Sequence, residues 1–337
     1  MTSSRMKLVI NIPCYNEEKT LSTVLAEIPK KIPGIQKIEV QIVDDGSTDR
    51  TSEIAASYGC KIISHKKNLG LGRAFKSGIE AALESGADIF VNTDADNQYP
   101  SSYIPDLITP VMNGSVDIVI GNRVPWKVEH FSPLKKTLQW FGNLIVRNLI
   151  GTNIPDTVSG FRAYSRESLL RLNITTKFSY VLDTIVQAVK MDLAVSSIPI
   201  PTNPPTRKSR LFKNIFQHMW KSGTSLVRLL IIYRPFQFFG VLAVTTFVPA
   251  LAIAIRFLIF FYLGIGKGHV QSLLFAVVLV IISGLFLVSA ILAFLIGNNR
   301  KLNEEILYYE KKRTFSKYYS DKLDHTIKFS KGQKSPH

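Results

Sequence analysis

The sequence predicts an α/β fold with a doubly wound, mostly parallel sheet, followed by two membrane-spanning helices. Apolar runs of strand length alternate with stretches of helical spacing over about 120 residues, which is the pattern of such a sheet. The polar clusters of this region follow the expected strands rather than interrupting them. Two apolar segments near the C-terminus are each long enough to cross a bilayer.

The expected elements follow from these patterns in order. Strands are predicted where short apolar runs are bounded by turn residues, at 7–12, 38–43, 61–64, 88–91, 116–120 and 194–200, with a further strand-like stretch at 156–162. Helices are predicted where apolar residues recur at helical spacing, at 17–28, from Thr48 or Asp49 to Tyr58, and at 70–85, 104–112, 133–150 and 181–191. Parallel strands bring their carboxyl ends to one edge of the sheet, where ligands bind in such folds.

The stretch N-T-D-A-D-N-Q-Y-P follows the fourth expected strand and opens a loop at that edge. Its carboxylates, Asp94 and Asp96, can share a divalent cation, and oxygen ligands suit Mg²⁺ or Mn²⁺. A solvated acidic turn is the simpler explanation of this D-x-D taken alone. However, residues 15–17 follow the first strand, and Asp44 and Asp45 follow the second. We therefore predict one cleft that these three polar groups line together.

Several classes of protein lose their main support in this sequence. No G-x-G-x-x-G follows the first strand and no G-x-x-x-x-G-K-[ST] occurs, which argues against dinucleotide-binding and P-loop folds.

Gly70 and Gly72 either form a tight turn or let backbone N–H groups approach a phosphate. Cys14 and Cys60 form neither a disulfide framework nor a metal motif. Because the N-terminus has no signal-peptide pattern, we expect the first domain to lie in the cytosol.

Charge is distributed unevenly along the chain. The net charge is +16, but 20 of the 25 acidic residues lie at or before Asp192, and none lies between Asp192 and Glu304, where 11 Lys and Arg occur. A basic, acid-free segment that leads into apolar sequence predicts an anionic membrane surface as partner, and no nucleic acid. The amphipathic stretch 211–233 predicts a helix in the membrane interface, with a helix packed on the protein as the alternative.

The two apolar segments, 235–263 and 270–296, are expected to form a transmembrane hairpin. Their outer flanks carry more Lys and Arg than the short link between them, so the positive-inside rule places both flanks and both termini in the cytosol. Arg256, the single charge of the first segment, is expected to extend its side chain to the interface.

These segments divide the chain into four expected parts. They are a cytosolic domain at 1–205, interfacial helices at 206–234, the hairpin at 235–296, and a basic cytosolic tail at 297–337. The tail is expected to begin as a helix, with apolar positions Leu302, Ile306 and Tyr309, and then to fray. The sequence leaves a homo-oligomer open.

Five motifs occur in order along the first two thirds of the chain. They are I-P-C-Y-N-E-E at 12–18, V-D-D-G-S-T-D at 43–49, N-L-G-L-G at 68–72, D-A-D-N-Q-Y-P at 94–100 and S-G-F-R-A-Y at 159–164. As an ordered set they are specific, and over residues 7–211 the chain resembles the glycosyltransferase family 2 enzymes of the polyprenyl-phosphate, dolichol-phosphate mannosyltransferase-like branch. The resemblance implies a Rossmann-like, A-type glycosyltransferase fold with membrane anchors.

The resemblance also implies a donor site for a UDP- or GDP-linked sugar. The residues that would line its nucleoside pocket are Pro13, Tyr15, Glu17 and Asp45, with Asp44 as a further candidate. Asp94 would contact the donor, and Asp96 and Gln98 would hold Mg²⁺ or Mn²⁺, with Asp94 as a third candidate ligand. Asp96 is thereby a catalytic candidate.

The implied acceptor is a polyprenyl phosphate, either undecaprenyl or dolichyl phosphate. Arg123 follows the fifth strand, where the family has an arginine for the acceptor phosphate, and Lys136 falls where the family has a second cation. Arg210 lies in Ser-Arg-Leu, where the family usually has Ser-Lys-Leu. Arg207 and Arg162 are further candidate ligands of this phosphate.

The reaction implied is attack of the acceptor phosphate on C1 of a hexose, with inversion, to give a polyprenyl-phosphate sugar for glycan, cell-wall or glycoconjugate modification. A phosphate monoester has its second pKa near 6, so it is already anionic at neutral pH and needs little help from a general base. Arg123 and Asp183 complete the catalytic candidates. Asp183 and Asp156 either act as a base or orient Arg123 or Arg162, and we favour the orienting role.

Two other functions compete with this interpretation. A processive polysaccharide synthase shares the donor motifs, but its usual Q-x-x-R-W is absent, since the nearest string here is Q-H-M-W. A non-catalytic, membrane-anchored protein that binds nucleotide sugars as a scaffold is the alternative from another class.

Overall fold

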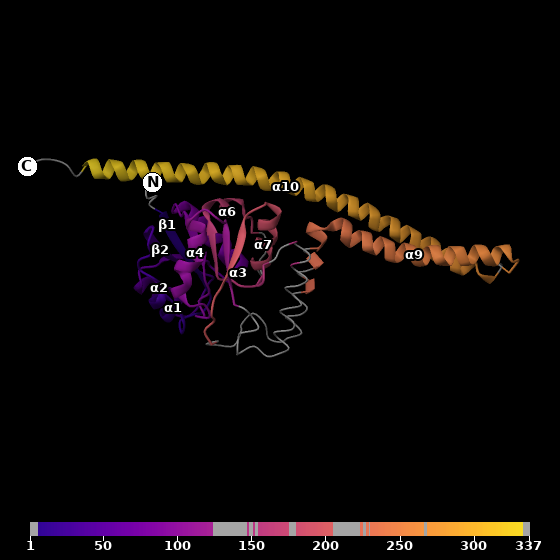
Figure 1. Ribbon diagram of the computed structural model, residues 1–337, viewed down its shortest axis with the longest axis horizontal. Coiled ribbons are helices and arrows are strands. Elements are labelled where there is room, and N and C mark those ends of the chain that lie inside the picture. The colour runs from indigo at the N-terminus through magenta and orange to yellow at the C-terminus, as the bar shows by residue number, and fades with distance from the viewer. Residues whose placement is uncertain are drawn as a thin grey trace, which may run out of the picture. The chain divides into compact units, whose positions relative to one another are not determined.

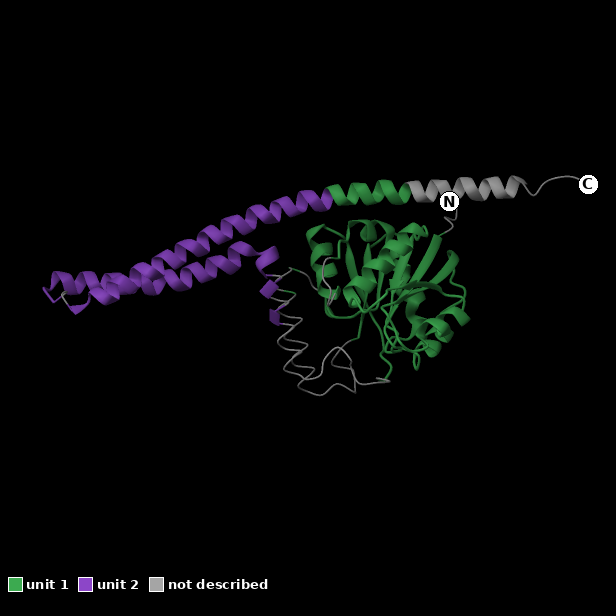
Figure 2. Ribbon diagram, turned by 180° about the vertical axis from the view of Figure 1, so that it is seen from behind, with its two compact units in different colours: residues 1–208, 306–337 green, residues 209–305 purple. Residues whose placement is uncertain are grey.

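The computed structural model describes residues 6–123, 147, 151, 154–174, 180–204, 223–224, 227–228, 230–265 and 268–332 (Figure 1). The chain divides into two compact units, Met1–Lys208 together with Ile306–His337, and Ser209–Glu305 (Figure 2). The first unit contains the α/β domain, and the second contains long apolar helices.

In the part of the chain that the structure describes, seven strands form one mixed sheet in the order β3-β2-β1-β4-β6-β5-β7. Their bounds are β1 Met6–Cys14, β2 Ile35–Asp44, β3 Lys61–Ser64, β4 Ile89–Asn92, β5 Ile118–Asn122, β6 Arg162–Ser165 and β7 Val195–Pro199. Only β6 runs antiparallel to its neighbours, β4 and β5. The carboxyl ends of the other six strands therefore meet at one edge, together with the start of β6. The predicted mostly parallel α/β sheet is confirmed.

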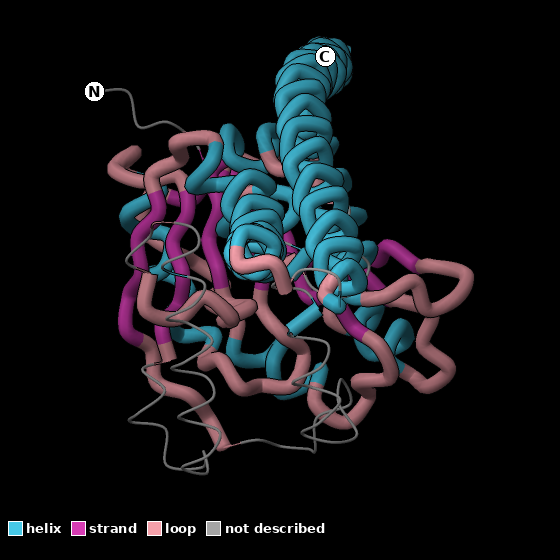
Figure 3. The backbone as a smooth tube through the Cα atoms, turned by 90° about the vertical axis from the view of Figure 1, so that its right-hand side faces the viewer, coloured by secondary structure: helices cyan, strands magenta, loops and turns pink. Residues whose placement is uncertain are grey.

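Helices cover both faces of this sheet, and Figure 3 colours them separately from the strands. The helices α1 Leu21–Glu27, α2 Thr51–Ser57 and α4 Ile104–Met112 share one core with alternate residues of β1, such as Ile10 and Ile12. On the other face, Phe75 of α3 (Leu71–Glu84) contacts Phe90 of β4 and stacks on Tyr180, which precedes α7 (Val181–Lys190). The domain is thus a three-layer structure with the sheet in the middle.

Two local expectations differ from the structure. The strand expected at 156–162 begins only at Arg162, because the Arg162 guanidinium binds the carbonyl oxygens of Thr157 and Ser159 and holds this stretch as a loop. The short helix α6 (Arg166–Arg171) was not predicted, although Ser165 caps it by accepting a hydrogen bond from the Ser168 N–H at 3.1 Å.

Among the described residues, two helices are long and apolar enough to cross a membrane, α9 Pro235–Tyr262 and α10 Val270–Gly332. Only 11% and 17% of their most apolar windows are buried, unlike a helix at the core of a soluble domain. Within the second unit they approach through small side chains, since the Ser283 hydroxyl donates to the Ala243 carbonyl at 2.9 Å. Instead of fraying after the apolar segment, α10 continues through most of the expected tail.

Candidate active site

The loops after β1 and β2 bind each other and form one polar wall at the carboxyl edge of the sheet. The Asn16 N–H donates to the Ser47 hydroxyl at 2.9 Å, and the Thr48 N–H donates to the Asn16 side-chain oxygen at 2.8 Å. The Glu17 N–H donates to the Thr51 hydroxyl at 2.8 Å. Asn16 has a positive φ of 56°, a conformation that asparagine tolerates better than most residues.

The residues predicted for the nucleoside pocket lie in this wall or at the ends of the two strands that lead into it. Tyr15 is the exposed one, with 41% of its surface accessible, and the buried ones are Pro13, Glu17, Asp44 and Asp45. Asp44 is held by the loop that follows it, because its Oδ1 accepts from the Ser47 N–H at 2.9 Å. The predicted residues are therefore neighbours, and most of their polar atoms already have partners within the protein.

Asp45 organises the start of helix α3. Its Oδ1 accepts from the Leu69 N–H at 2.9 Å, and its Oδ2 accepts from the Gly70 N–H at 2.8 Å. His65 Nδ1 lies 2.7 Å from Asp45 Oδ1, while His65 Nε2 lies 3.0 Å from the Ser77 hydroxyl of α3. A carboxylate at a helix N-terminus is favoured by the helix dipole. His65 was not predicted, although it directly follows β3 at the same edge.

The acidic loop follows β4, as predicted, and its two carboxylates are half-buried. The Asp94 carboxylate lies against Gly160, where a Cβ atom would stand 3.0 Å from Asp94 Oδ2. Any larger residue at 160 would press on this oxygen. Asp96 Oδ1 accepts from the Gln98 N–H at 3.2 Å, which closes the loop locally. Gly160 thus provides the room that Asp94 occupies.

The acidic loop suits a hard divalent cation in its chemistry. Among the residues that the structure describes, no group of three His, Cys, Asp or Glu side chains could hold a metal ion. The loop offers instead two carboxylates one residue apart, Asp94 and Asp96, and the amide of Gln98. Mg²⁺ is typically held by one or two carboxylates, with waters and substrate phosphates completing its coordination. The residues present therefore fit Mg²⁺ or Mn²⁺.

A row of buried polar side chains runs beneath this edge of the sheet. Gln41, Asn11 and Asn92 stand opposite one another on β2, β1 and β4, and all three are fully buried. Gln41 donates to the Asn11 side-chain oxygen at 2.9 Å, and Asn11 donates to the Asn92 side-chain oxygen at 2.8 Å. Asn92 in turn donates to the Gly160 carbonyl at 3.2 Å. The row therefore connects three strands to the glycine behind Asp94.

Arg162, a predicted ligand of the acceptor phosphate, continues this row and is fully buried. Its guanidinium donates to the carbonyls of Ser159 at 2.7 Å, Val181 at 2.8 Å and Thr157 at 3.0 Å, and to the Thr184 hydroxyl at 2.8 Å. These contacts fasten the loop before β6 to the start of α7. In this structure Arg162 holds the loop in place and does not present its charge to solvent.

Arg123 follows β5 and forms a bidentate ion pair with Asp156. Arg123 Nε donates to Asp156 Oδ2 at 2.8 Å, and Nη2 donates to Oδ1 at 3.0 Å. Burial alone would raise the pKa of the fully buried Asp156, but Arg123 lowers that pKa below its usual value. Burial would lower the pKa of Arg123, but Tyr99 and Asp156 together raise it. The pair stays charged, and Asp156 fixes the direction of the guanidinium.

The remaining predicted residues are placed only in part. Asp183 is buried in the first turn of α7, next to Thr184, which binds Arg162. Lys136, Arg207 and Arg210 lie outside the described residues, as do the helix expected at 133–150, apart from Arg147, and most of the segment 206–234. Of the predicted acceptor cations, the structure therefore locates Arg123 and Arg162.

Comparison with known proteins agrees with this architecture. A crystal structure of glucosyl-3-phosphoglycerate synthase from Mycobacterium tuberculosis, in complex with Mn²⁺, UDP and phosphoglyceric acid, is similar with a TM-score of 0.53 at 21% identity, over 68% of this chain and 78% of that one. The same enzyme with Mg²⁺ and UDP gives a TM-score of 0.51. At this identity the likeness shows the fold, which is that of an A-type glycosyltransferase.

Relatives by sequence are more specific. A dolichyl-phosphate hexose transferase of Haloferax volcanii is 30% identical over 208 residues, which cover 60% of this chain and 86% of that protein. An undecaprenyl-phosphate mannosyltransferase of Micrococcus luteus is 28% identical over 206 residues, or 58% of this chain and 83% of that protein. The model of glycosyl transferase family 2 matches residues 9–172, from β1 to the end of α6. The chain therefore belongs to glycosyl transferase family 2 and is a glycosyltransferase.

Proposed function

We propose that this enzyme transfers a hexose from a nucleotide sugar to a polyprenyl phosphate in a membrane. The observation that carries the proposal is the meeting of two chemistries at one sheet edge. The acidic loops follow β1, β2 and β4, and the Arg123–Asp156 pair follows β5. The names of the relatives above, a dolichyl-phosphate hexose transferase and an undecaprenyl-phosphate mannosyltransferase, support a polyprenyl phosphate as the acceptor.

On the donor side, we assign the nucleoside to the wall formed by the loops after β1 and β2. Tyr15 is the exposed aromatic side chain of that wall and can cover a base, while Asp45 shapes the neighbouring turn. We assign the diphosphate to the loop of Asp94 and Asp96, with Gln98 as a further ligand of the cation. A bound Mg²⁺ or Mn²⁺ would neutralise charge on the leaving diphosphate. The donor is a UDP- or GDP-linked sugar in this proposal.

On the acceptor side, we assign the lipid phosphate to Arg123, whose guanidinium Asp156 keeps charged and oriented. Lys136, Arg207 and Arg210 are proposed as further ligands of the same phosphate. Arg162 is assigned to the loop behind Asp94 instead, because its charge is enclosed by backbone carbonyls. Asp183, buried beside the Arg162 network, is proposed to support this loop and not to act as a base.

The proposed chemistry needs two bond changes at one carbon. An acceptor phosphate oxygen attacks C1 of the sugar, the new C1–O bond forms, and the bond between C1 and the diphosphate oxygen breaks. Attack opposite the leaving group inverts the configuration at C1. Since the phosphate is already anionic at neutral pH, the protein's task is to position the two substrates and to stabilise charge.

The proposal also places the enzyme in a membrane. We propose that α9 and α10 form a transmembrane hairpin, that residues 206–234 lie in the interface, and that the catalytic domain and both termini are cytosolic. The support is the length and apolar character of both helices, together with the lipid acceptors of the relatives.

The test is a transfer assay with the purified full chain, polyprenyl phosphate, Mg²⁺ or Mn²⁺, and a panel of UDP- and GDP-linked sugars. One donor is expected to give a sugar-phospho-lipid. Asp96→Ala should abolish transfer, whereas Asp106→Ala, a change at an exposed acidic residue of α4, should leave it unchanged. Donor binding without turnover would favour the scaffold, a long polymer would favour a processive synthase, and full activity of Asp96→Ala would refute the metal assignment.

A further inference from the structure

The part of α10 beyond Glu305 belongs to the same compact unit as the glycosyltransferase domain. Between 306 and 316, the less exposed positions are Leu307, Tyr308, Lys311 and Phe315, and Phe315 is buried with 8% exposure. These positions recur at intervals of three or four, which places them on one face of the helix. The face covers about two turns and points to a packing contact.

This face differs from the one that the apolar spacing of the sequence predicts, which consists of Leu302, Ile306 and Tyr309. Ile306 is 65% exposed, Tyr309 is 61% exposed, and Leu302 is 60% exposed. The packed face carries polar and amphipathic residues, Tyr308 and Lys311, whose hydrogen-bonding groups need partners when they are covered. The contact is therefore made specific by polar partners on the domain.

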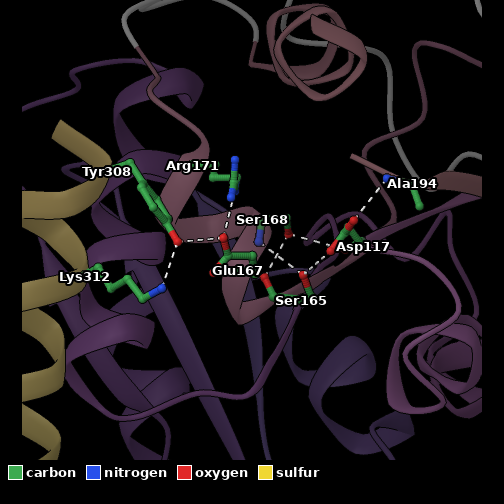
Figure 4. Close-up of polar contacts among 8 residues, drawn as sticks. All are labelled: Asp117, Ser165, Glu167, Ser168, Arg171, Ala194, Tyr308 and Lys312. Carbon is green, nitrogen blue, oxygen red and sulfur yellow. Dashed lines mark hydrogen bonds and ion pairs between the residues drawn. The ribbon is translucent and has the colours of Figure 1, made fainter. Parts of the chain in front are cut away.

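Glu167, in the first turn of α6, is the centre of the contact (Figure 4). Its Oε1 accepts from the Tyr308 hydroxyl at 2.8 Å and from Arg171 Nε at 2.7 Å. The Arg171 guanidinium lies over the Tyr308 ring, 4.7 Å from its centre, and Lys312 Nζ donates to the Tyr308 oxygen at 3.0 Å. Although burial raises the pKa of Glu167, Arg171 and Tyr308 lower it, so the carboxylate is charged at neutral pH.

The other end of α6 makes a second contact with α10. Lys311 Nζ donates to the carbonyl oxygen of Leu172, the C-cap residue of α6, at 2.8 Å. The last carbonyls of a helix lack partners within it, and a cation is favoured there by the helix dipole. α10 therefore binds both ends of α6, through an acceptor at the start and a backbone carbonyl at the end.

α6 is itself held firmly on its inner side. The Ser165 hydroxyl donates to Asp117 Oδ1 at 3.2 Å, and the Ser168 hydroxyl donates to the Ser165 carbonyl at 2.8 Å (Figure 4). Asp117 Oδ2 also accepts from the Ala194 N–H at 3.0 Å, which connects the starts of β5 and β7. The surface that α10 meets is thus fastened to the sheet by contacts that do not involve α10.

We propose that residues 307–315 of α10 are a docking helix for the outer face of α6, with Glu167 and the Leu172 carbonyl as its two polar contacts. The catalytic domain would then hold the chain after the membrane hairpin as well as before it. The occupant of this surface is the chain's own C-terminal segment. The proposal concerns a contact within the protein and does not depend on the identity of the substrates.

The test is hydrogen–deuterium exchange of the full chain in detergent micelles, followed by peptides that cover 307–315. A hydrogen bond to a charged group contributes enough that its loss should speed exchange of this segment at least about ten-fold. We expect this effect for Tyr308→Phe, which lacks the donor, and for Glu167→Ala, which lacks the acceptor. Tyr309→Phe is the matched control, because the neighbouring Tyr309 is exposed. In this variant the segment 307–315 should exchange at the rate of the wild type.

Two further readouts keep the test decisive. Peptides from α1, remote in sequence from the contact, should be unchanged in every variant and show that the domain is folded. The double variant should add little to either single change, because both remove the same hydrogen bond. Exchange of 307–315 in the wild type as fast as in an unstructured peptide would overturn the proposal, as would equal exchange in Tyr308→Phe and Tyr309→Phe. No substrate is used, so an incorrect assignment of the reaction cannot produce either result.

Discussion

Removing the carboxylate of Asp156 should destabilise the domain strongly, because it leaves the Arg123 guanidinium without its counter-charge. The side chain of Asp156 is fully buried and that of Arg123 is 12% exposed. Losing one partner of a buried ion pair costs about 3–5 kcal/mol, since the other charge stays out of water. For a domain of about 200 residues, each kcal/mol lowers Tm by roughly 2–4 °C. Asp156→Ala should therefore lower Tm by roughly 6–20 °C.

The measurement is thermal unfolding of the full chain in detergent, compared among Asp156→Ala, Arg123→Ala and the double variant. The double variant should be more stable than the sum of the two single losses predicts, by at least about 1 kcal/mol, because no unpaired charge remains. The pKa of Asp156 is lowered in the folded state, so its contribution is present above the ordinary aspartate pKa and is lost as pH falls through the lowered value. The difference between wild type and Asp156→Ala should accordingly be constant near pH 7 and shrink below about pH 4. Equal Tm values at pH 7, or additive losses in the double variant, would refute this reasoning.

Three other predictions concern the domain and its docking helix. Gly78→Ala should lower Tm, because the new Cβ would stand 2.3 Å from Asn11 Oδ1 and overpacking costs about 1–3 kcal/mol. Gly240→Ala is the control and should not lower Tm, because a Cβ at that position would have no atom within 4 Å. Equal Tm values for the two variants would contradict the packing at Gly78. Asn92→Leu should cost at least about 2 kcal/mol in chemical denaturation, since Asn11 and Tyr180 lose a buried partner, and a neutral result would show that the row is dispensable. Burial lowers the pKa of Lys311, which lies near Glu80 and Lys76 of α3, to about 8. Between pH 8 and 10 the folded protein therefore binds fewer protons than the unfolded chain, so the Tm of the wild type relative to Lys311→Met should rise over this range. A constant difference in Tm would contradict this reasoning.

The sequence was sufficient for the fold because its periodicities are local and strong. Strand β3 and helix α4 have the bounds that the apolar patterns predict, and most other elements differ by a few residues at their ends. The exceptions are places where side-chain hydrogen bonds decide the backbone. Arg162 holds the residues before it as a loop, and α10 continues as a helix beyond its apolar part, where it packs on the domain. Such hydrogen bonds have no trace in the apolar periodicity of the sequence.

For the site, the carboxyl-edge rule found the acidic loops because it needs only the order of strands and polar clusters. The same rule applied to β3 would have found His65, which follows that strand and contacts Asp45. The carboxamide row was harder to foresee, because Gln41, Asn11 and Asn92 are single polar residues in apolar strands. Their significance lies in the register that places them opposite one another.

The two arginines of the site show why residue type and motif position do not determine a role. Arg123 and Arg162 both lie at the carboxyl edge, and both are candidates for an anionic substrate by charge. Arg123 is paired with a carboxylate that keeps its charge and direction, and part of its side chain remains accessible. Arg162 is bound by carbonyls and a hydroxyl and has no accessible surface. A phosphate can reach only the first without breaking the loop behind Asp94. The partners of each guanidinium, rather than its position in a motif, are therefore our reason to propose Arg123, and not Arg162, for the acceptor phosphate.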